Sequence, residues 1–377
     1  MSARIKDKKI KMKSSDFVLV ILTLSITIFG VIMVFSASYY NAINDFSDPY
    51  YYLKRDVVFA VIGVMGMFLL AVIPYRAYKK FAIPILLLSF VLLLLLLTPL
   101  GIERNYATRW LGVEGFPLTI MPGEIAKLAA IIFVAWYLSR EPSVIKSLTR
   151  GIIPLLGLCG VYAFMIGIIS SNMSTAITVC GIIVGMMFIA GLNWLYLAGM
   201  IGAGVLGAVA LVLAPGGDYR LKRITSFLDP FADPLDTGYQ VVQSLLALGS
   251  GGLFGLGLGK GIQKNLYLPE AQNDFILAII GEELGLIGIL ILMIAYLILI
   301  WRCTHIALNA VDMFGTLLAS GITIMLALQV ILNVAVVTSS MPPTGITLPF
   351  ISYGGNALWL FMGAMGIMLN ISRHSAR

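Results

Sequence analysis

Ten long runs of apolar residues follow one another along this chain, and they constrain its fold more than any other feature. A helix that spans a bilayer needs about 20 mostly apolar residues, and in hydrocarbon only helices or closed barrels satisfy the backbone. The runs are too long and too continuously apolar for barrel strands. We therefore predict about ten transmembrane helices, with cores at Phe17–Val34, Val57–Ile73, Phe81–Leu97, Ile120–Leu138, Ile152–Ile169, Thr175–Ile189, Trp194–Leu213, Phe275–Trp301, Met313–Val337 and Phe350–Leu369.

The composition is that of a chain with the bilayer as its solvent. Of its 377 residues, 59% are hydrophobic and 11% are charged, whereas a soluble domain has about 25% charged residues. We therefore predict an all-α fold, a polytopic integral membrane protein with a large extracytoplasmic loop. Cys159, Cys180 and Cys303 lack the spacing of a disulfide framework or a zinc site, so we expect them to be packing residues.

The lysines and arginines predict the direction in which the chain crosses the membrane. Cytoplasmic loops are enriched in these residues, and placing both termini in the cytoplasm puts most of the basic residues on that side. The predicted parts are a basic cytoplasmic N-terminus (1–16), a single transmembrane domain (17–371) and a cytoplasmic tail (372–377). The longest loop, residues 214–274, is then extracytoplasmic. The net charge of +7 is explained by this topology, and we expect no nucleic-acid partner.

Two groups of charged side chains fall inside or beside the predicted spans, where a charge costs roughly 2.5–3.5 kcal/mol at mid-membrane. In the first group, Glu124 and Lys127 are three residues apart on one helix face and can form an ion pair. A structural ion pair and a substrate contact explain them equally well. Arg104, Arg109 and Trp110 lie in the outer loop before that helix, and we take them as further candidates for substrate binding.

The second group consists of Glu270, Asp274, Glu282 and Glu283, at the outer start of the eighth predicted span. Asp274 falls in the first turn after Pro269, where the helix dipole favours a carboxylate, so a capping role also explains it. A carboxylate at the mouth of a buried polar cavity suits general-base catalysis on a hydroxyl. We favour that role for Asp274, with Glu270 and Glu282 nearby. Glu282 and Glu283 point to different faces, so both need partners in the protein interior.

The glycine-rich segment Gly251–Gly261 (GGLFGLGLGKG) resembles a phosphate-binding loop only superficially. Lys260 is followed by Gly261, not by Ser or Thr, and no strand–loop–helix unit surrounds it, which excludes Walker and Rossmann loops. A flexible re-entrant turn explains the glycines; the alternative is a diphosphate held by backbone N–H groups near Lys260 and Lys264. Arg220 belongs to an outer basic cluster that binds either anionic headgroups or a lipid-linked phosphate.

The segment PPTGITLPFISYGG, residues 342–355, interrupts regular helix at the start of the last span. Broken backbone at membrane depth is tolerated only where protein or a cavity shields it. We therefore expect this segment, with Ser352 and Gly354, to line the same outer cavity.

These segments resemble the SEDS family of membrane proteins, which includes FtsW, RodA and SpoVE. The resemblance extends over nearly the whole chain. Its most specific blocks are KRITSFLDPFADPLDTGYQVVQSLLALGSGGLFGLGLG, QKNLYLPEAQNDFILAIIGEELGLIG and PPTGITLPFISYGG. The segments SFLDPFADP and QKNLYLPEAQ are more similar to the FtsW and SpoVE branch than to RodA.

The resemblance implies a peptidoglycan glycosyltransferase that polymerises lipid II at the outer face of a bacterial plasma membrane, in cell division or sporulation. It implies that the catalytic aspartate is Asp274, that an important loop tryptophan is Trp110, and that a further motif falls on Pro122, Glu124 and Lys127. It also implies two kinds of partner: a class B penicillin-binding protein, which is a transpeptidase, and divisome-type membrane proteins.

At five positions the chain departs from the family pattern. Asn172 stands where the resemblance leads us to expect an aspartate, and this is the departure that most affects the expected activity. The others are Gly123 for a serine, Ser174 for a glycine, Asn273 for a threonine and Asn356 for a serine.

For the reaction, we expect Asp274 to take the proton from the C4 hydroxyl of the acceptor N-acetylglucosamine. That oxygen then attacks C1 of the donor N-acetylmuramic acid with inversion, and undecaprenyl diphosphate leaves. A divalent cation, Mg²⁺ or Mn²⁺, held by Asp274 or Glu282 is one way to stabilise the diphosphate. Cationic side chains are the other, and the candidates are Arg109, Lys127, Arg220, Lys260 and Lys264.

The competing function is a flippase or transporter for a lipid-linked precursor, which also needs buried charge and broken helices. A transporter needs a site near the midplane that is reachable from both sides. Here the motifs gather toward the outer side, which favours the polymerase. A scaffold that only recruits an enzyme would leave Asp274 unexplained.

Overall fold

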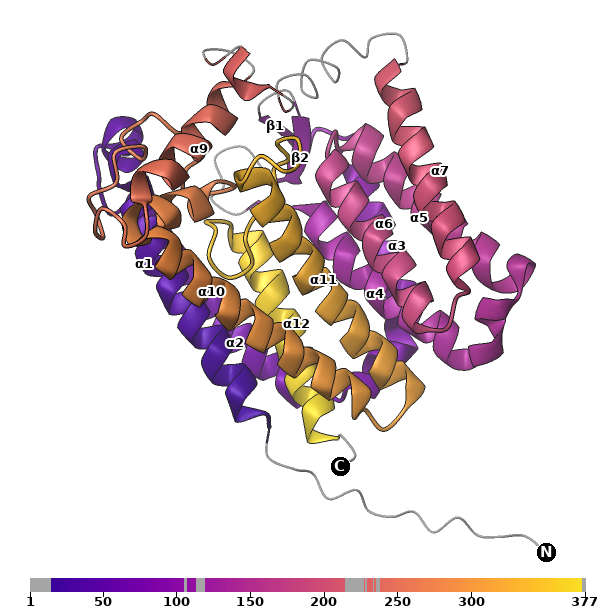
Figure 1. Ribbon diagram of the computed structural model, residues 1–377. Helices are drawn as coiled ribbons and strands as arrows, with labels where there is room; N and C mark the ends of the chain where they lie inside the picture. The colour runs from indigo at the N-terminus through magenta and orange to yellow at the C-terminus, as the bar shows by residue number, and fades with distance from the viewer. Residues whose placement is uncertain are drawn as a thin grey trace, which may run out of the picture.

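The computed structural model describes residues 15–104, 107–112, 119–213, 227, 229–232, 234 and 238–374. Of the predicted site residues, Arg220 lies outside the described residues, and so does the side chain of Arg104. The described chain is a bundle of long helices with a small hairpin and several loops at one end (Figure 1).

The long helices are α1 (Phe17–Phe46), α2 (Tyr51–Val72), α3 (Tyr75–Leu95), α4 (Pro122–Arg140), α5 (Ile153–Phe164), α6 (Met173–Ile189), α7 (Trp194–Leu213), α9 (Tyr239–Gly251), α10 (Ile276–Leu308), α11 (Met313–Val337) and α12 (Gly355–Arg373). Short 3-10 or π-helical turns are η1 (Pro142–Lys146), η2 (Leu148–Ile152), η3 (Met165–Ile169) and η4 (Pro230–Ala232). The strands β1 (Gly101–Arg104) and β2 (Ala107–Leu111) pair antiparallel.

The helices confirm the polytopic membrane fold that hydropathy predicted. Among the described residues, eight helical segments are long and apolar enough to cross a membrane, and α6 and α7 add shorter apolar helices. Each predicted core overlaps one of these ten helical segments.

Several helix ends differ from the predicted core boundaries, and two of them bear on the candidate site. The first core was placed at Phe17–Val34, but α1 continues to Phe46 and ends at Ser47, whose φ of 54° is left-handed. The last core was placed from Phe350, but α12 starts only at Gly355. Hydropathy locates the stretch that matches hydrocarbon, whereas helix ends depend on caps and on local breaks in the backbone.

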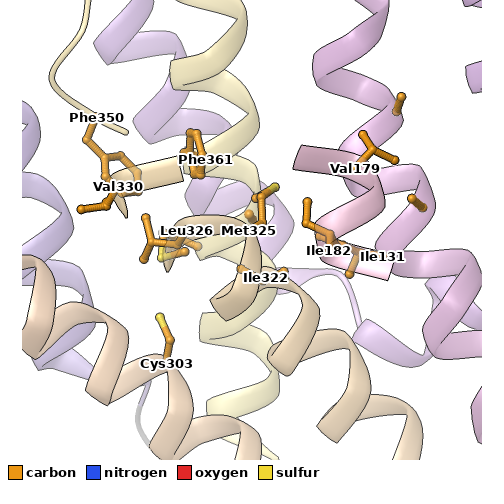
Figure 2. Close-up of a cluster of buried hydrophobic side chains, with 14 of the residues drawn as sticks. Ile131, Val179, Ile182, Cys303, Ile322, Met325, Leu326, Val330, Phe350 and Phe361 are labelled. Carbon is orange, nitrogen blue, oxygen red and sulfur yellow. The ribbon is translucent and has the colours of Figure 1, made fainter. Parts of the chain in front are cut away.

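Small residues allow the helices to approach closely, as is usual where the bilayer gives no hydrophobic driving force between helices. A Cβ on Gly366 of α12 would lie 2.3 Å from the carbonyl oxygen of Met67 in α2. A Cβ on Gly321 of α11 would lie 2.6 Å from a methyl carbon of Ile131 in α4. Figure 2 shows the apolar side chains packed around that second crossing, including Ile131 and Ile182.

The start of α1 and the end of α12 lie at the same end of the bundle (Figure 1). The Asp16 carboxylate pairs with Arg302, near the end of α10, at 2.6 Å, and the Asp16 N–H donates to Ser372 Oγ at 3.2 Å. The opposite end carries β1, β2, α9 and residues 338–354. We call it the loop end, and the candidate site lies there.

Candidate functional site

Asp274 lies at the loop end, directly before α10. α10 begins at Ile276 with Phe275 as its N-cap, so Asp274 precedes the helix and does not cap it. Asn333 of α11 donates to the Asp274 carbonyl oxygen at 2.9 Å and to the Ile346 carbonyl oxygen at 2.7 Å. One buried amide therefore ties the backbone of Asp274 to the proline-rich segment 342–355.

The side chains of Asp274 and Arg109 both lie close to Gly345, a residue of that segment. A Cβ on Gly345 would lie 3.2 Å from Asp274 Oδ2 and 3.8 Å from Arg109 Nη1. Arg109 also donates from Nη2 to the Ser171 carbonyl oxygen at 3.2 Å. Residues from β2, the start of α6, the start of α10 and segment 342–355 thus converge on one carboxylate and one guanidinium.

The surroundings of Asp274 make its carboxyl a weaker acid than an aspartate in water. Burial, and next the negative charge of Glu270, raise the pKa of Asp274 from 3.8 to about 7, while the positive charge of Arg109 acts in the opposite direction. A general base works best when its pKa lies near the operating pH. Asp274 therefore has the electrostatic environment that proton transfer at neutral pH requires.

The predicted pairing of Glu124 and Lys127 is present in the structure. Their side chains are buried and 2.7 Å apart, and Lys127 also donates to Gln329 Oε1 of α11 at 3.0 Å. Gln329 in turn donates to Thr347 Oγ1 at 3.3 Å. The ion pair therefore connects α4 through α11 to segment 342–355, next to the candidate site; a substrate contact for the pair stays a prediction.

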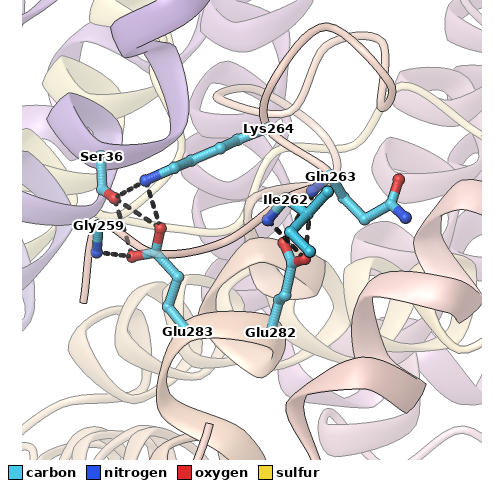
Figure 3. Close-up of polar contacts among 7 residues, drawn as sticks. All are labelled: Ser36, Gly259, Ile262, Gln263, Lys264, Glu282 and Glu283. Carbon is cyan, nitrogen blue, oxygen red and sulfur yellow. Dashed lines mark hydrogen bonds and ion pairs between the residues drawn. The ribbon is translucent and has the colours of Figure 1, made fainter. Parts of the chain in front are cut away.

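Glu282 and Glu283 have the interior partners that we expected, as Figure 3 shows. Glu283 pairs with Lys264 at 2.6 Å and accepts a hydrogen bond from Ser36 of α1 at 2.8 Å. Glu282 accepts from the backbone N–H groups of Ile262 and Gln263 at 2.8 and 3.1 Å. The two acids thus hold the loop before Asp274 against α1 and α10.

The glycine-rich segment packs on a break in α10 at Gly285, whose φ is 69°. The N–H groups of Leu256 and Gly257 donate to the carbonyl oxygens of Glu282 and Glu283 at 3.0 and 2.9 Å. Glycine is required here because a Cβ on Gly255 would lie 2.2 Å from the Glu283 carbonyl oxygen. These amides already have acceptors in the protein, so they are not free to cradle a diphosphate.

The remaining predicted residues occupy different surroundings. Lys260 is exposed, whereas Lys264 is buried in its ion pair. A substrate phosphate can therefore reach Lys260 far more easily than Lys264. Ser352 is buried and accepts a hydrogen bond from the Leu348 N–H at 2.7 Å, which stabilises the turn of segment 342–355. Gly354 is the N-cap of α12. Trp110 is half-buried in β2, opposite Ile102 of β1.

The structure also shows the contacts of Glu270 and of the three asparagines that depart from the family pattern. Glu270 is exposed and accepts a hydrogen bond from the Asn273 amide. Asn172 caps α6, accepting from the Thr175 N–H at 3.1 Å, a bond that an aspartate makes equally well. Asn356 donates to the Thr119 carbonyl oxygen at 2.9 Å.

Gln329, Asn333 and Gly345 were missed by the sequence reasoning. A signal existed for the first two, because polar residues inside a transmembrane helix are rare and mark functional or packing contacts. They are four residues apart and therefore share one face of α11. Nothing in the sequence distinguished Gly345 from the other glycines.

The whole chain can now be compared with known proteins. The family model described as "Cell cycle protein", which covers FtsW, RodA and SpoVE, matches residues 16–377. The chain belongs to the FtsW/RodA/SpoVE family.

Relatives and solved structures agree with this assignment. Stage V sporulation protein E of Bacillus subtilis (strain 168) is 44% identical over 97% of this chain and 99% of its own length. Probable peptidoglycan glycosyltransferase FtsW of Geobacter sp. (strain M18) is 40% identical over 96% and 98%. A chain of the solved structure described as "Structural coordination of polymerization and crosslinking by a peptidoglycan synthase complex" matches with a TM-score of 0.78 and 27% identity, over 95% of this chain and 98% of that one. RodA of Thermus thermophilus matches with a TM-score of 0.68 and 26% identity, over 96% and 98%.

Proposed function

We propose that this protein is a peptidoglycan glycosyltransferase that polymerises lipid II during cell division or sporulation. The observation that carries the proposal is the position of Asp274, whose pKa is about 7, and of Arg109 around the same glycine, Gly345, at the loop end. A named glycosyltransferase relative, 40% identical over 96% of this chain, supports it.

In the proposed reaction, the Asp274 carboxylate accepts the proton of the acceptor's C4 hydroxyl. The C4 oxygen forms a bond to C1 of the donor N-acetylmuramic acid as the bond from C1 to the diphosphate oxygen breaks. A single displacement of this kind inverts C1 and needs no covalent intermediate. The departing diphosphate takes the bonding electrons, and in this proposal the Arg109 guanidinium, which lies near Gly345 as Asp274 does, stabilises its negative charge.

A divalent cation held by Asp274 or Glu282 is the other expected way to stabilise the diphosphate, and at Glu282 the carboxylate already has partners in the protein. The oxygens of Glu282 accept the N–H groups of Ile262 and Gln263. Within the described part of the chain, no three His, Cys, Asp or Glu side chains gather in one place, but a Mg²⁺ ion shared with a substrate diphosphate needs only one or two carboxylates. No step proposed here depends on a metal, and the need for Mg²⁺ or Mn²⁺ stays a prediction.

For the orientation, we infer that the loop end faces outward and that residues 1–16 and 372–377 are cytoplasmic. Residues 17–371 would then form a single transmembrane domain. The basic residues of the N-terminus support this orientation, and so does the site's position at one end of the bundle. A flippase instead needs a site near the midplane.

We infer that the chain works with a class B penicillin-binding protein, and the match to a chain of a solved peptidoglycan synthase complex supports this partner. Divisome-type proteins as further partners rest on the family resemblance alone.

The proposed function is tested with the purified protein in liposomes, using fluorescent lipid II with and without a transpeptidase partner. Glycan strands that lengthen with time, with lipid II remaining in its own leaflet, are the expected result. Movement of lipid II across the bilayer without polymer would instead assign the flippase function.

A further inference from the structure

Two tyrosines from distant parts of the chain meet beside the segment that carries Asp274. Tyr52 is in the first turn of α2 and Tyr353 is in segment 342–355; their rings meet edge to face, with centroids 5.0 Å apart and planes at 89°. The Tyr353 N–H donates to the Gln272 carbonyl oxygen at 2.9 Å. Asn41 of α1 donates to the Gln272 side chain at 3.0 Å. The ring pair is thus fixed to the chain two residues before Asp274.

A second pair of aromatic side chains packs beside Tyr353. Phe59 of α2 lies 6.4 Å from the Tyr353 ring and 5.4 Å from Trp359 of α12. The Trp359 indole donates to the Phe59 carbonyl oxygen at 2.9 Å. Gly355 lets this layer pack closely, since a Cβ there would lie 2.9 Å from the Phe59 ring. The orientation of Tyr353 is therefore set before any ligand arrives.

The chemistry of this corner suits a sugar. Tyr52 and Tyr353 are half-buried, and neither hydroxyl makes a hydrogen bond to any residue that the structure describes. Glu270 lies four residues before Asp274, and its exposed carboxylate accepts a hydrogen bond from the Asn273 amide. Its negative charge adds to burial in raising the pKa of both Tyr52 and Asp274. An aromatic face packs against the C–H face of a pyranose ring, while phenol and carboxylate oxygens bind its hydroxyl and acetamido groups.

We propose that Tyr52 and Tyr353, with Glu270, form the subsite for the acceptor's N-acetylhexosamine ring and present its hydroxyl to Asp274. This inference rests on the proposed function, because it names where one substrate of that reaction sits. It assigns Tyr52 and Tyr353 as substrate-binding residues and Glu270 as a further polar contact for the sugar.

The competing explanation is an aromatic belt, in which tyrosines at the end of a span only anchor the protein at the membrane interface. Tyr40 provides the matched control. It lies near the loop end of α1, is 42% exposed, and contacts Tyr39 at 5.3 Å. A belt role predicts that Tyr40→Leu and Tyr52→Leu behave alike.

Binding is measured in the Asp274→Asn background, so that no turnover is needed. The probes are lipid II with a shortened prenyl chain and the same prenyl diphosphate without its sugars. We expect Tyr52→Leu to weaken lipid II binding roughly threefold to tenfold, the loss of one aromatic contact. Binding of the sugar-free probe and binding by Tyr40→Leu should change less than about twofold. Tyr52→Phe, a milder change that keeps the ring, should retain most of the affinity.

Equal loss of affinity for both probes, or no loss for lipid II in Tyr52→Leu and Tyr353→Leu, would overturn the subsite. The proposed function is judged separately, by polymerisation in the wild type. If the wild type makes no polymer but Tyr52→Leu selectively weakens the sugar-bearing probe, the polymerase fails and the tyrosines are left as a sugar-binding site without an acceptor role. If the wild type makes polymer and Tyr52→Leu binds normally, only the subsite fails.

Discussion

The Asp274 carboxylate and the Arg109 guanidinium lie around the same glycine: a Cβ added to Gly345 would lie 3.2 Å from Asp274 Oδ2 and 3.8 Å from Arg109 Nη1. The two residues are 165 positions apart in the sequence. Their proximity depends on β2 and segment 342–355 meeting at the loop end.

The first prediction concerns Gly345→Ala. The new methyl group would push the Asp274 carboxylate away from Arg109, and small displacements of a catalytic group reduce rates by about tenfold to a hundredfold. We expect that loss in lipid II polymerisation, with unfolding temperature in detergent nearly unchanged. The control is Gly157→Ala in α5, where no atom lies within 4 Å of the added Cβ. Wild-type activity in Gly345→Ala would show that the distance between Asp274 and Arg109 does not matter for the reaction.

The second prediction concerns pH. Asp274 must be ionised to accept a proton, and its pKa is about 7, so the rate should rise with pH and level off above about 7. Glu270 raises this pKa; Glu270→Gln should therefore move the rising limb to lower pH. Glu103→Gln, a change of an exposed acid on β1, should leave the limb in place. If the wild-type rate instead rises and levels off near pH 4, Asp274 is not the titrating base.

The third prediction concerns the buried pair of Lys264 and Glu283. Lys264→Met leaves Glu283 without its cation, and such a loss costs about 3–5 kcal/mol of stability. The double change Lys264→Met with Glu283→Gln should recover much of that loss, because no uncompensated charge remains. Thermal unfolding in detergent measures both. If Lys264→Met is fully stable and only its lipid II affinity falls, Lys264 acts on the substrate phosphate as first expected.

The fourth prediction concerns Asn333. Asn333→Leu removes the amide that holds the carbonyl oxygens of Asp274 and Ile346, and leaving such acceptors unsatisfied costs about 1–3 kcal/mol. We expect lower stability together with a fall in kcat, since the base loses its fixed position. Thr338→Val, at the exposed end of α11, is the control. An unchanged kcat in a destabilised Asn333→Leu would limit Asn333 to a structural role.

Much of the fold could be predicted from the sequence because spanning helices obey one strong rule, the need for a long apolar run. The rule says nothing about helix ends, so the extension of α1 to Phe46 and the late start of α12 at Gly355 were missed. The pairing of Glu124 with Lys127 could be predicted because it is local, within one helix turn.

The site was harder to predict, because its contacts join distant segments. Asp274 and Arg109 were both named as candidates, yet nothing in the sequence placed them over the same glycine. Lys264 was taken for a phosphate ligand because a lysine beside a glycine-rich loop suggests one, whereas its partner, Glu283, lies across a tertiary contact. The corner of Tyr52 and Tyr353 likewise depends on α2 packing against the start of α12.

The central claim is that Asp274 is the base of the glycosyl transfer, and polymerisation of labelled lipid II by purified Asp274→Asn tests it most directly. Asparagine keeps the size of the side chain but cannot accept the proton, and loss of a general base costs about a hundredfold to ten-thousandfold in rate. We predict a loss in that range at pH 8, with the unfolding temperature and lipid II binding retained. Glycan strands formed by a folded Asp274→Asn at the wild-type rate would contradict the account.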